Sequence, residues 1–324
     1  MSDPGEFTRL SRLRHLLGGD ADGVPVGVGD DAAVIAVGGV DVVVCVDTIV
    51  EGVHFRRDLS DPADVGWKAI AVNVSDVAAM GGRPRAAVVA LNRPPDLAEA
   101  DVEGLYTGMA EAAARWGAPV VGGDTVTAGE WSVAVTVLGE LDGRPAVRRA
   151  GARPGDAVLL AGAIGAAAAG LAVDAAGGRP DPAHLAAHRR PQALPATGAA
   201  LARAGATAMI DVSDGLGADA RHICEASGVH LVLDTTAVEG CVAAGVADAV
   251  GEGWLDLALG GGEDFVLRAT VPADLAADAV AAVRAAGETS ATVIGTVTAG
   301  DDREVWLIGD GGRRRIDHLG YDHG

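Results

Sequence analysis

Residues 208–216 read AMIDVSDGL, an apolar run that ends in two aspartates three positions apart and then a glycine. The run at 208–210 is typical of a buried strand. Two carboxylates of like charge repel each other at the end of such a strand, so Asp211 and Asp214 need a compensating partner. Acids end several other predicted elements of the chain in the same way.

Strands and helices alternate on both sides of this stretch. Residues 40–46 form a β-branched run that is typical of a strand. A helix is expected from Pro62, a residue favoured at the first helical position, to about Met80, just before Gly81. The second half repeats this mixture of strands and helices. Residues 142–156 are rich in Gly, Pro and Arg, so we place a domain boundary there.

Composition limits the class of protein. The chain has 324 residues, enough for about two domains that each bury a core. Its 45 acids and 25 bases give a net charge of −20, which disfavours nucleic acid and anionic membranes as partners. Cys45, Cys224 and Cys241 form no CxxC pair and are expected to be reduced thiols in a cytoplasmic protein. No signal peptide is recognisable, and the apolar segment 157–173 is too short and too rich in Ala and Gly to favour a membrane span.

Further polar residues lie at predicted element ends beside small residues. They are Asp30 and Asp31 after a glycine turn, Asp47 after the run 40–46, Asn73 and Asp76 near the end of one helix, Asp124 after two glycines, and Glu263 and Asp264 after three. Each one alone is ordinary turn or cap chemistry. Together with Asp211 and Asp214 they can converge on one crevice. Converging carboxylates with no lysine among them need cations.

The donor set favours a hard cation. Oxygen ligands suit Mg²⁺ or Ca²⁺ rather than Zn²⁺, because neither the cysteines nor the eight histidines have zinc-ligand spacing. An EF-hand loop that starts at Asp211 fits poorly, because Ser213, Gly215 and Leu216 stand where an acid, an acid and a glycine belong. Dispersed carboxylates that leave room for water and phosphate oxygens favour Mg²⁺ bound together with a nucleotide.

The common nucleotide-binding motifs are absent. GxxxxGK[ST] does not occur, and the only lysine of the chain is Lys68, on the helix that begins at Pro62. No HRD or DFG motif occurs, since Asp264-Phe265 continues to Val266. GAIGAAAAG at 162–170 lacks the GxGxxG spacing, and close helix packing explains its glycines at least as well.

Seven motifs in order carry a resemblance to a known family. They are GDDAAV, DTIVEGVHF, WKAIAVNVSDVAAMGG, VVGGDT, RAGARPGD, DVSDGL and GGEDF. In order and approximate spacing they resemble the thiamine-monophosphate kinases, which belong to the aminoimidazole ribonucleotide synthetase-like superfamily. The resemblance runs from about residue 5 to GYDH at 320–323, so it covers nearly the whole chain.

This resemblance implies a role for particular residues. The implied Mg²⁺ ligands are Asp31, Asp47, Asp76, Asp124, Asp211 and Asp214, of which Asp47 and Asp211 are the implied catalytic residues. The implied ATP contacts are Gly123, Asp124, Arg149 and Ser213, and the implied contacts to thiamine monophosphate are His54, Glu263 and His318. Tyr106 lies near an adenine-side position of the family, but its apolar helix face favours core packing.

The resemblance also implies the architecture. It predicts a mixed α/β, two-domain, aminoimidazole ribonucleotide synthetase-like fold. Residues 1–141 would bind ATP and Mg²⁺ and pair with a second copy, so that the first sheet completes a barrel across a homodimer. Residues 150–324 would form a second α/β domain with a tail that returns to the active site.

The reaction implied is transfer of the γ-phosphoryl group of ATP to thiamine monophosphate, giving thiamine diphosphate and ADP. Donor and acceptor are both anions, so their approach requires neutralisation by several Mg²⁺ ions. The acceptor phosphate is already ionised near neutral pH and needs no strong base. We therefore expect direct in-line transfer, with an aspartyl-phosphate on Asp47 or Asp211 as the alternative.

Three positions depart from the family pattern, and other functions stay open. Cys45-Val46 stands where relatives carry hydroxyl residues near the metals, Ala replaces polar residues in 162–170, and His318 stands where relatives place a tryptophan. An aminoimidazole ribonucleotide synthetase or a selenophosphate synthetase would share the metal aspartates, although no reactive N-terminal Cys segment supports the latter. The alternative from another class is a non-enzymatic acidic module that binds Mg²⁺ or Ca²⁺.

Overall fold

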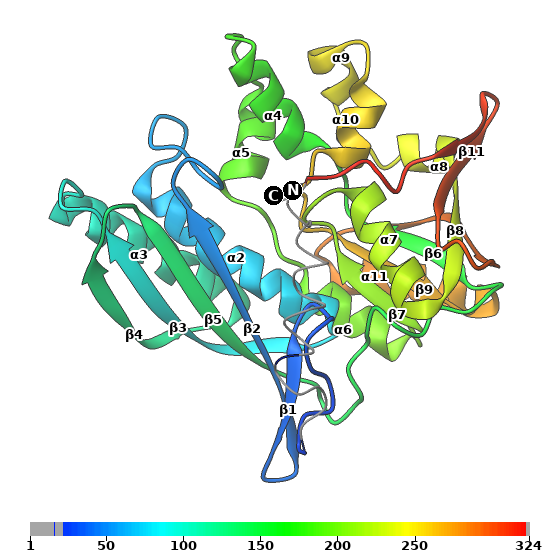
Figure 1. Ribbon diagram of the computed structural model, residues 1–324, viewed down its shortest axis with the longest axis horizontal. Helices are drawn as coiled ribbons and strands as arrows, with labels where there is room; N and C mark the ends of the chain where they lie inside the picture. The colour runs from blue at the N-terminus through cyan, green and yellow to red at the C-terminus, as the bar shows by residue number, and fades with distance from the viewer. Residues whose placement is uncertain (1–15, 17–21, 322–324) are drawn as a thin grey trace.

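The computed structural model describes residue 16 and residues 22–321. Two β-sheets form the centres of two α/β domains that lie side by side (Figure 1). The predicted mixed α/β, two-domain fold is thereby confirmed. The first sheet ends at Glu140 and the second begins at Ala157, on either side of the predicted boundary segment. The limits 1–141 and 150–324 stay predictions, and Asp322 and His323 of the GYDH motif lie outside the described residues.

The first sheet has, in the described part of the chain, five strands in the order β1-β2-β5-β3-β4. They are β1 (Ala33–Val37), β2 (Val40–Val50), β3 (Arg83–Arg93), β4 (Val120–Thr127) and β5 (Ser132–Glu140). Helices α2 (Pro62–Ala79) and α3 (Glu99–Trp116) cover one face of this sheet (Figure 1). Val133, Val135 and Val137 of β5 are fully buried and alternate with less buried residues, so one face of the sheet packs against the helices.

Helix α2 follows the sequence prediction closely. Pro62 is its first residue, and the backbone N–H of Asp61 donates to the carboxylate of Asp64 at 3.4 Å. The helix ends just before Met80. The residue after Met80 is Gly81, which has the left-handed backbone (φ 74°) that glycine favours. Thirteen of its 18 residues are buried. The helix is buried on nearly all sides because it packs on the first sheet and α3 and also on α6 and β7 of the second domain.

Two glycines allow α2 and α3 to cross at very close range. A Cβ atom on Gly66 would lie 1.9 Å from the carbonyl oxygen of Leu105. A Cβ atom on Gly108 would lie 1.8 Å from the carbonyl oxygen of Ala63. No side chain can be accommodated at either position unless the helices separate. The position of α2, and of every polar group it carries, is therefore fixed.

The second sheet has the order β12-β11-β8-β10-β6-β9-β7 in the described residues. Its strands are β6 (Ala157–Ala161), β7 (Ala208–Asp211), β8 (Val229–Asp234), β9 (Leu267–Val271), β10 (Ala291–Ala299), β11 (Val305–Gly309) and β12 (Gly312–Arg315). The longer helices of this domain are α4 (Ala166–Ala175), α5 (Pro182–Arg189), α6 (Pro195–Arg203), α7 (Leu216–Ser227) and α11 (Ala276–Ala286). Three shorter ones are α8 (Thr235–Glu239), α9 (Val246–Val250) and α10 (Trp254–Gly260), and η1 (Ala273–Leu275) is a 3₁₀ turn.

One strand boundary that bears on the site was predicted wrongly. Residues 40–46 do form a strand, but Asp47 does not end it, because β2 continues to Val50. The reason is tertiary: β2 pairs with β5 over its whole second half, from Cys45 opposite Val137 to Val50 opposite Ser132. Asp47 therefore stands within a strand whose backbone is held rigidly on one side.

Candidate active site

Three aspartates from different parts of the chain converge where the two domains meet. Asp31 lies just before β1, Asp76 lies on the last turns of α2, and Asp211 ends β7. A carboxylate oxygen of each lies within 4.8 Å of the other two. A helix of the first domain and a strand of the second domain therefore both end at this cluster, where carboxylates of like charge lie close together.

Burial and mutual repulsion disfavour the charged forms of these carboxylates. Burial raises the pKa of Asp76 well above its usual range, and repulsion from Asp47 and Asp211 raises it further. Burial and the charge of Asp31 raise the pKa of Asp211 to about 8, although the hydroxyl of Ser75 donates to its carboxylate at 2.5 Å. Without a cation, these groups are poorly compensated.

Arg149 compensates only part of this charge. Its guanidinium donates to one oxygen of Asp31 from Nε at 3.1 Å and from Nη2 at 2.6 Å. Its backbone N–H donates to Asp30 at 3.0 Å. The other oxygen of Asp31, Oδ2, is buried and has no hydrogen-bond partner. A buried anionic oxygen without a donor, facing two more carboxylates, fits the requirement of a hard divalent cation.

Asp47 adjoins this cluster. Its backbone N–H donates to the side-chain oxygen of Asn73 on α2 at 2.8 Å, and its charge contributes to the raised pKa of Asp76. Cys45, one of the departures from the family pattern, turns instead toward α2, where its thiol lies 3.2 Å from the backbone oxygen of Asn73. Burial, with the charges of Asp76 and Asp47, raises the pKa of that thiol well above its usual value. A neutral thiol is a poor ligand for Mg²⁺.

Gly123 and Asp124 do not join the cluster within this chain. Both lie on β4, an edge strand, and Asp124 is exposed. Asp124 pairs with Ala90 of β3, and β4 lies three strand positions from β2, a separation of about 14 Å. A Cβ atom on Gly123 would lie 1.9 Å from the carbonyl oxygen of Val89, so only glycine fits beside β3 here.

Ser213, Asp214 and the GGED loop form a second edge of the site. The carbonyl oxygen of Ser213 accepts the backbone N–H of Glu263 at 2.7 Å. The backbone N–H of Asp214 donates to the carboxylate of Asp219 at 3.1 Å. Asp219 was missed by the sequence reasoning. Its burial and the charge of Asp214 raise its pKa well above the usual range, and its place five residues after Asp214 on α7 is the only signal that the sequence offers.

Glu263 is held by two residues that sequence reasoning did not assign. Lys68 of α2 donates from Nζ to Oε1 of Glu263 at 2.5 Å, and His188 of α5 contacts Oε2 through Nδ1. Lys68 also donates to the carbonyl oxygen of His54 at 2.7 Å. The ring Nδ1 of His54 accepts the backbone N–H of Val50 at 3.1 Å, so the neutral ring carries its proton on Nε2. The predicted substrate residues His54 and Glu263 thus meet through Lys68.

The C-terminal tail returns to this region. The backbone N–H of Tyr321 donates to the carbonyl oxygen of Asp214 at 3.0 Å, and the carbonyl oxygen of Leu319 accepts from Ala218 at 2.9 Å. His318 lies on this tail and is exposed. Its predicted contact with the substrate stays a prediction.

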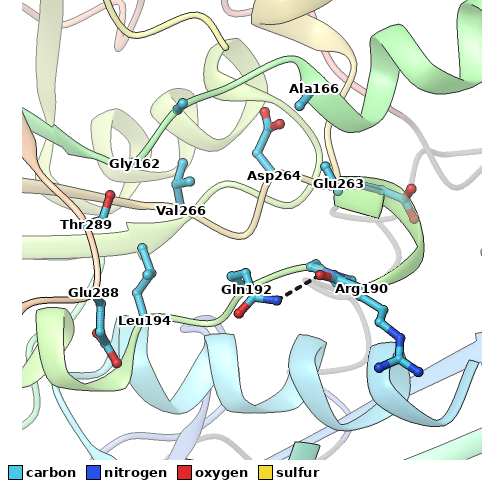
Figure 2. A pocket seen from close by; sticks show the side chains of 13 residues that line it. Gly162, Ala166, Arg190, Gln192, Leu194, Glu263, Asp264, Val266, Glu288 and Thr289 are labelled. Carbon is cyan, nitrogen blue, oxygen red and sulfur yellow. Dashed lines mark hydrogen bonds between the residues drawn. The ribbon is translucent and has the colours of Figure 1, made fainter. Parts of the chain in front are cut away.

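A cavity of about 210 Å³ lies beside the GGED loop. Glu263 and Asp264 form one wall, with Gln192 across from them (Figure 2). The carboxyl group of Glu263 is directed away from Gln192 and Leu194 in this view. One oxygen of Asp264 accepts the backbone N–H of Gly165 at 2.8 Å, and burial raises the pKa of Asp264 well above its usual value. None of the lining residues belongs to the aspartate cluster, so the cavity is separate from that cluster.

Both halves of the chain match known domain families. Residues 29–141 match the AIR synthase related protein N-terminal domain, and residues 153–308 match the corresponding C-terminal domain. The thiamine-monophosphate kinase of Mycobacterium tuberculosis (strain H37Rv) is 44% identical over 266 residues, which are 81% of this chain and 79% of that protein. The thiamine-monophosphate kinase of Escherichia coli (strain K12) is 34% identical over 330 residues, covering 98% of each.

Solved structures agree with these matches. The structure of AaThiL complexed with AMPPCP and TMP has a TM-score of 0.86 and 31% identity, covering 100% of this chain and 98% of that chain. Thiamine monophosphate kinase from Aquifex aeolicus has a TM-score of 0.79 and 30% identity, covering 95% and 97%. The two matched domains, one after the other, assign the chain to the class of AIR synthase related proteins. This chain belongs to that class and, within it, to the thiamine-monophosphate kinase family.

No helix in the described part of the chain is long and apolar enough to cross a membrane.

Proposed function

We propose that this protein transfers the γ-phosphoryl group of ATP to thiamine monophosphate, with Mg²⁺, by direct in-line displacement. The observation that carries the proposal is the convergence of Asp31, Asp76 and Asp211 at the domain junction, in a chain of this family. The named relatives are thiamine-monophosphate kinases, and AaThiL was solved with an ATP analogue, AMPPCP, and TMP. We assign the same two substrates to this chain.

The aspartate cluster is the part of the site that would hold Mg²⁺. Asp31, Asp76 and Asp211, with Asp47 beside them, supply the hard oxygen donors. Bound Mg²⁺ would neutralise the phosphate oxygens of both substrates. Asp214 lies three residues after Asp211, in the loop that also carries Ser213, and it remains a proposed ligand. Arg149, already paired with Asp31, would bring a positive group next to the phosphates of ATP.

Direct transfer suits these residues better than an aspartyl-phosphate. Asp211 is only 4% exposed, and one of its oxygens already accepts from Ser75. Asp47 lies beside two other carboxylates whose charges oppose the approach of a phosphoryl group. A carboxylate that is enclosed, or that is bound to a cation, is poorly placed to attack a phosphoryl group, whereas the acceptor phosphate brings its own ionised oxygen. We therefore assign Asp47 and Asp211 to cation binding during transfer and not to covalent catalysis.

We also propose that two copies pair through the first domain. The sheet face opposite α2 and α3 carries Val46, Val88 and Val126, which are 62%, 36% and 46% exposed. The second half of β2 has β5 on one side and, among the described strands, none on the other, and β4 is likewise an edge. Two-fold pairing of these edges would cover the valines. Asp124, exposed on the edge strand β4, would then lie at the contact between the copies.

The cell compartment follows as a proposal. ATP and Mg²⁺ are cytoplasmic, and Cys45, Cys224 and Cys241 are all buried free thiols, as expected of a reducing compartment. We place the protein in the cytoplasm.

A product assay tests the proposed reaction. Purified protein is incubated with MgATP and thiamine monophosphate, and thiamine diphosphate and ADP are separated by chromatography. Parallel reactions carry free thiamine, or the Asp211→Asn variant. We expect equimolar thiamine diphosphate and ADP from wild type with thiamine monophosphate, and neither product from the variant. Stabilisation by Mg²⁺ alone, with no effect of ATP and no product, would instead indicate the non-enzymatic metal-binding module.

A further inference from the structure

Lys68 occupies an unusual position for a lysine. It is the only lysine among 324 residues, and it lies in the middle of α2 with 2% of its surface exposed. Burial of an ammonium group is unfavourable and lowers the pKa of Lys68, an effect that the neighbouring charge of Glu263 opposes. An apolar residue would fill the same space without loss of solvation, so stability alone does not explain a lysine at this position.

The contacts of Lys68 join three segments that are far apart in the sequence. Its Nζ donates to the carbonyl oxygen of His54, in the turn after β2, and to Glu263, in the GGED loop of the second domain. The ring of His188 on α5 lies 3.4 Å away and contacts the other oxygen of Glu263. The Lys68–Glu263 pair spans the domain junction.

Glu263 is held firmly by this arrangement. Both of its carboxylate oxygens are engaged, one by Lys68 and one by His188. Its backbone has φ 60°, a left-handed conformation that a non-glycine residue adopts only when its surroundings enforce it. The preceding Gly262 fits tightly, since a Cβ atom there would lie 2.4 Å from the carbonyl oxygen of Ser213. The side chain of Glu263 is 22% exposed, so part of it remains available to a ligand.

Helix α2 connects this arrangement to the metal site. Lys68 and Asp76 are eight residues apart on α2, which corresponds to about 12 Å along the axis. The helix cannot shift against α3 because Gly66 and Gly108 lie in direct backbone contact at the crossing. The rigid helix α2 therefore sets the distance between Asp76 of the proposed cation site and Lys68, which holds Glu263.

We propose that Lys68 is a positioning residue for the phosphate acceptor: it fixes the carboxylate of Glu263 and the turn that carries His54 in one arrangement and so sets the affinity for thiamine monophosphate. The inference rests on the proposed function. Thiamine carries a cationic thiazolium ring, for which a fixed carboxylate is the complementary group. Lys68 itself touches neither substrate. Its effect is on acceptor binding, and ATP and Mg²⁺ bind at the other end of α2.

Steady-state kinetics of Lys68→Met provides the first test. Met fills the space of the lysine side chain without its charge. We expect the KM for thiamine monophosphate to rise at least tenfold, the KM for ATP to stay within twofold and kcat within threefold of wild type. Glu263→Gln should also raise the KM for thiamine monophosphate, and the free-energy effect of the double variant should be smaller than the sum of the two single effects, because the Lys68–Glu263 contact is lost in each variant. A drop in kcat with both KM values unchanged, or additive effects, would overturn the proposal.

Arg56→Met is the matched control. Arg56 forms an ion pair with Asp174 of α4 at 3.1 Å, so it too joins the two domains, but it does not touch Glu263. The same chemical change at this position should leave all three kinetic constants within twofold. An equal rise in the acceptor KM for this variant would mean that any loosening of the domain junction has the effect, and the specific role of Lys68 would be refuted.

The single lysine also allows a test that needs no turnover. In wild-type protein labelled with ¹³C-lysine, one Cε signal reports on Lys68. Thiamine monophosphate added with Mg²⁺ should shift this signal, and the non-hydrolysable ATP analogue AMPPCP should shift it much less. Suppose that wild type forms thiamine diphosphate, that the Cε signal does not shift with thiamine monophosphate, and that Lys68→Met keeps the wild-type KM. Only the proposed role of Lys68 is then refuted. If wild type forms no product and the signal does not move, the proposed function fails as well.

Discussion

Asp211→Asn should produce an inactive protein that is more stable than wild type when metal is removed. Burial and the charge of Asp31 raise the pKa of Asp211 from an ordinary value of 3.8 to about 8. At pH 7 the folded protein must therefore take up a proton, or hold a repelled charge, that the unfolded chain does not. Each pKa unit between 3.8 and 7 corresponds to about 1.4 kcal/mol. Because the Asn amide also loses solvation, we expect a net gain of about 2 to 4 kcal/mol.

The assay is urea unfolding in EDTA at pH 7, followed in parallel by a product assay with MgATP. Asp301→Asn, the same change at an exposed turn residue, is the control and should shift neither stability nor activity. With Mg²⁺ present the order should reverse, since only wild type retains the full set of ligands. If the metal-free variant is less stable than wild type, the carboxylates are not held in an unfavourable cluster, and the argument for a cation site at Asp211 is refuted.

Four further outcomes can be checked. In EDTA, the free energy of unfolding should fall as pH rises from about 4 to about 8, because the raised pKa of Asp211 makes the folded state bind a proton that the unfolded state has released. Urea midpoints with and without Mg²⁺ should converge at low pH and separate as pH rises. Gly108→Ala should cost at least about 2 kcal/mol by forcing a methyl group against the carbonyl oxygen of Ala63, whereas Gly129→Ala, which faces open space, should be neutral in the same unfolding assay. Val46→Lys should dissociate the proposed dimer in light scattering without loss of helical circular dichroism, since this side chain is already 62% exposed in one chain.

Local sequence signals were enough to predict the elements and to single out the three aspartates of the cluster. Pro62 at the start of α2 and Gly81 beyond its end are local determinants, and the helix follows them within one residue. Asp31 and Asp211 could be predicted because acids after a strand or a glycine turn lie at element ends, where crevices form. The prediction that the strand ends at Asp47 was wrong, and this shows the limit of that rule. A strand continues as long as a neighbour pairs with it, and the pairing partner β5 lies some 90 residues further on.

Contacts across the domain junction could not be predicted. Glu263 pairs with a lysine 195 positions away, and no periodicity or spacing relates the two residues. Within the second domain, Arg268 was equally unpredictable: it is fully buried in β9, where a hydrophobic residue is expected, and donates to the carbonyl oxygen of Leu216. The sequence shows that Lys68 is the only lysine, but its contact with Glu263 depends on how the second domain packs against α2.

The position of the aspartate cluster explains why the chain has two domains that must meet. Asp31 and Asp76 belong to the first domain and Asp211 to the second, so closing the junction without a cation brings like charges within 4.8 Å. Lys68, on the same helix as Asp76, pairs with Glu263 of the second domain and supplies attraction across the same junction. The two interactions oppose each other in the metal-free protein and cooperate once Mg²⁺ is bound. Metal binding should therefore remove the repulsion between the domains and tighten the domain junction as a whole.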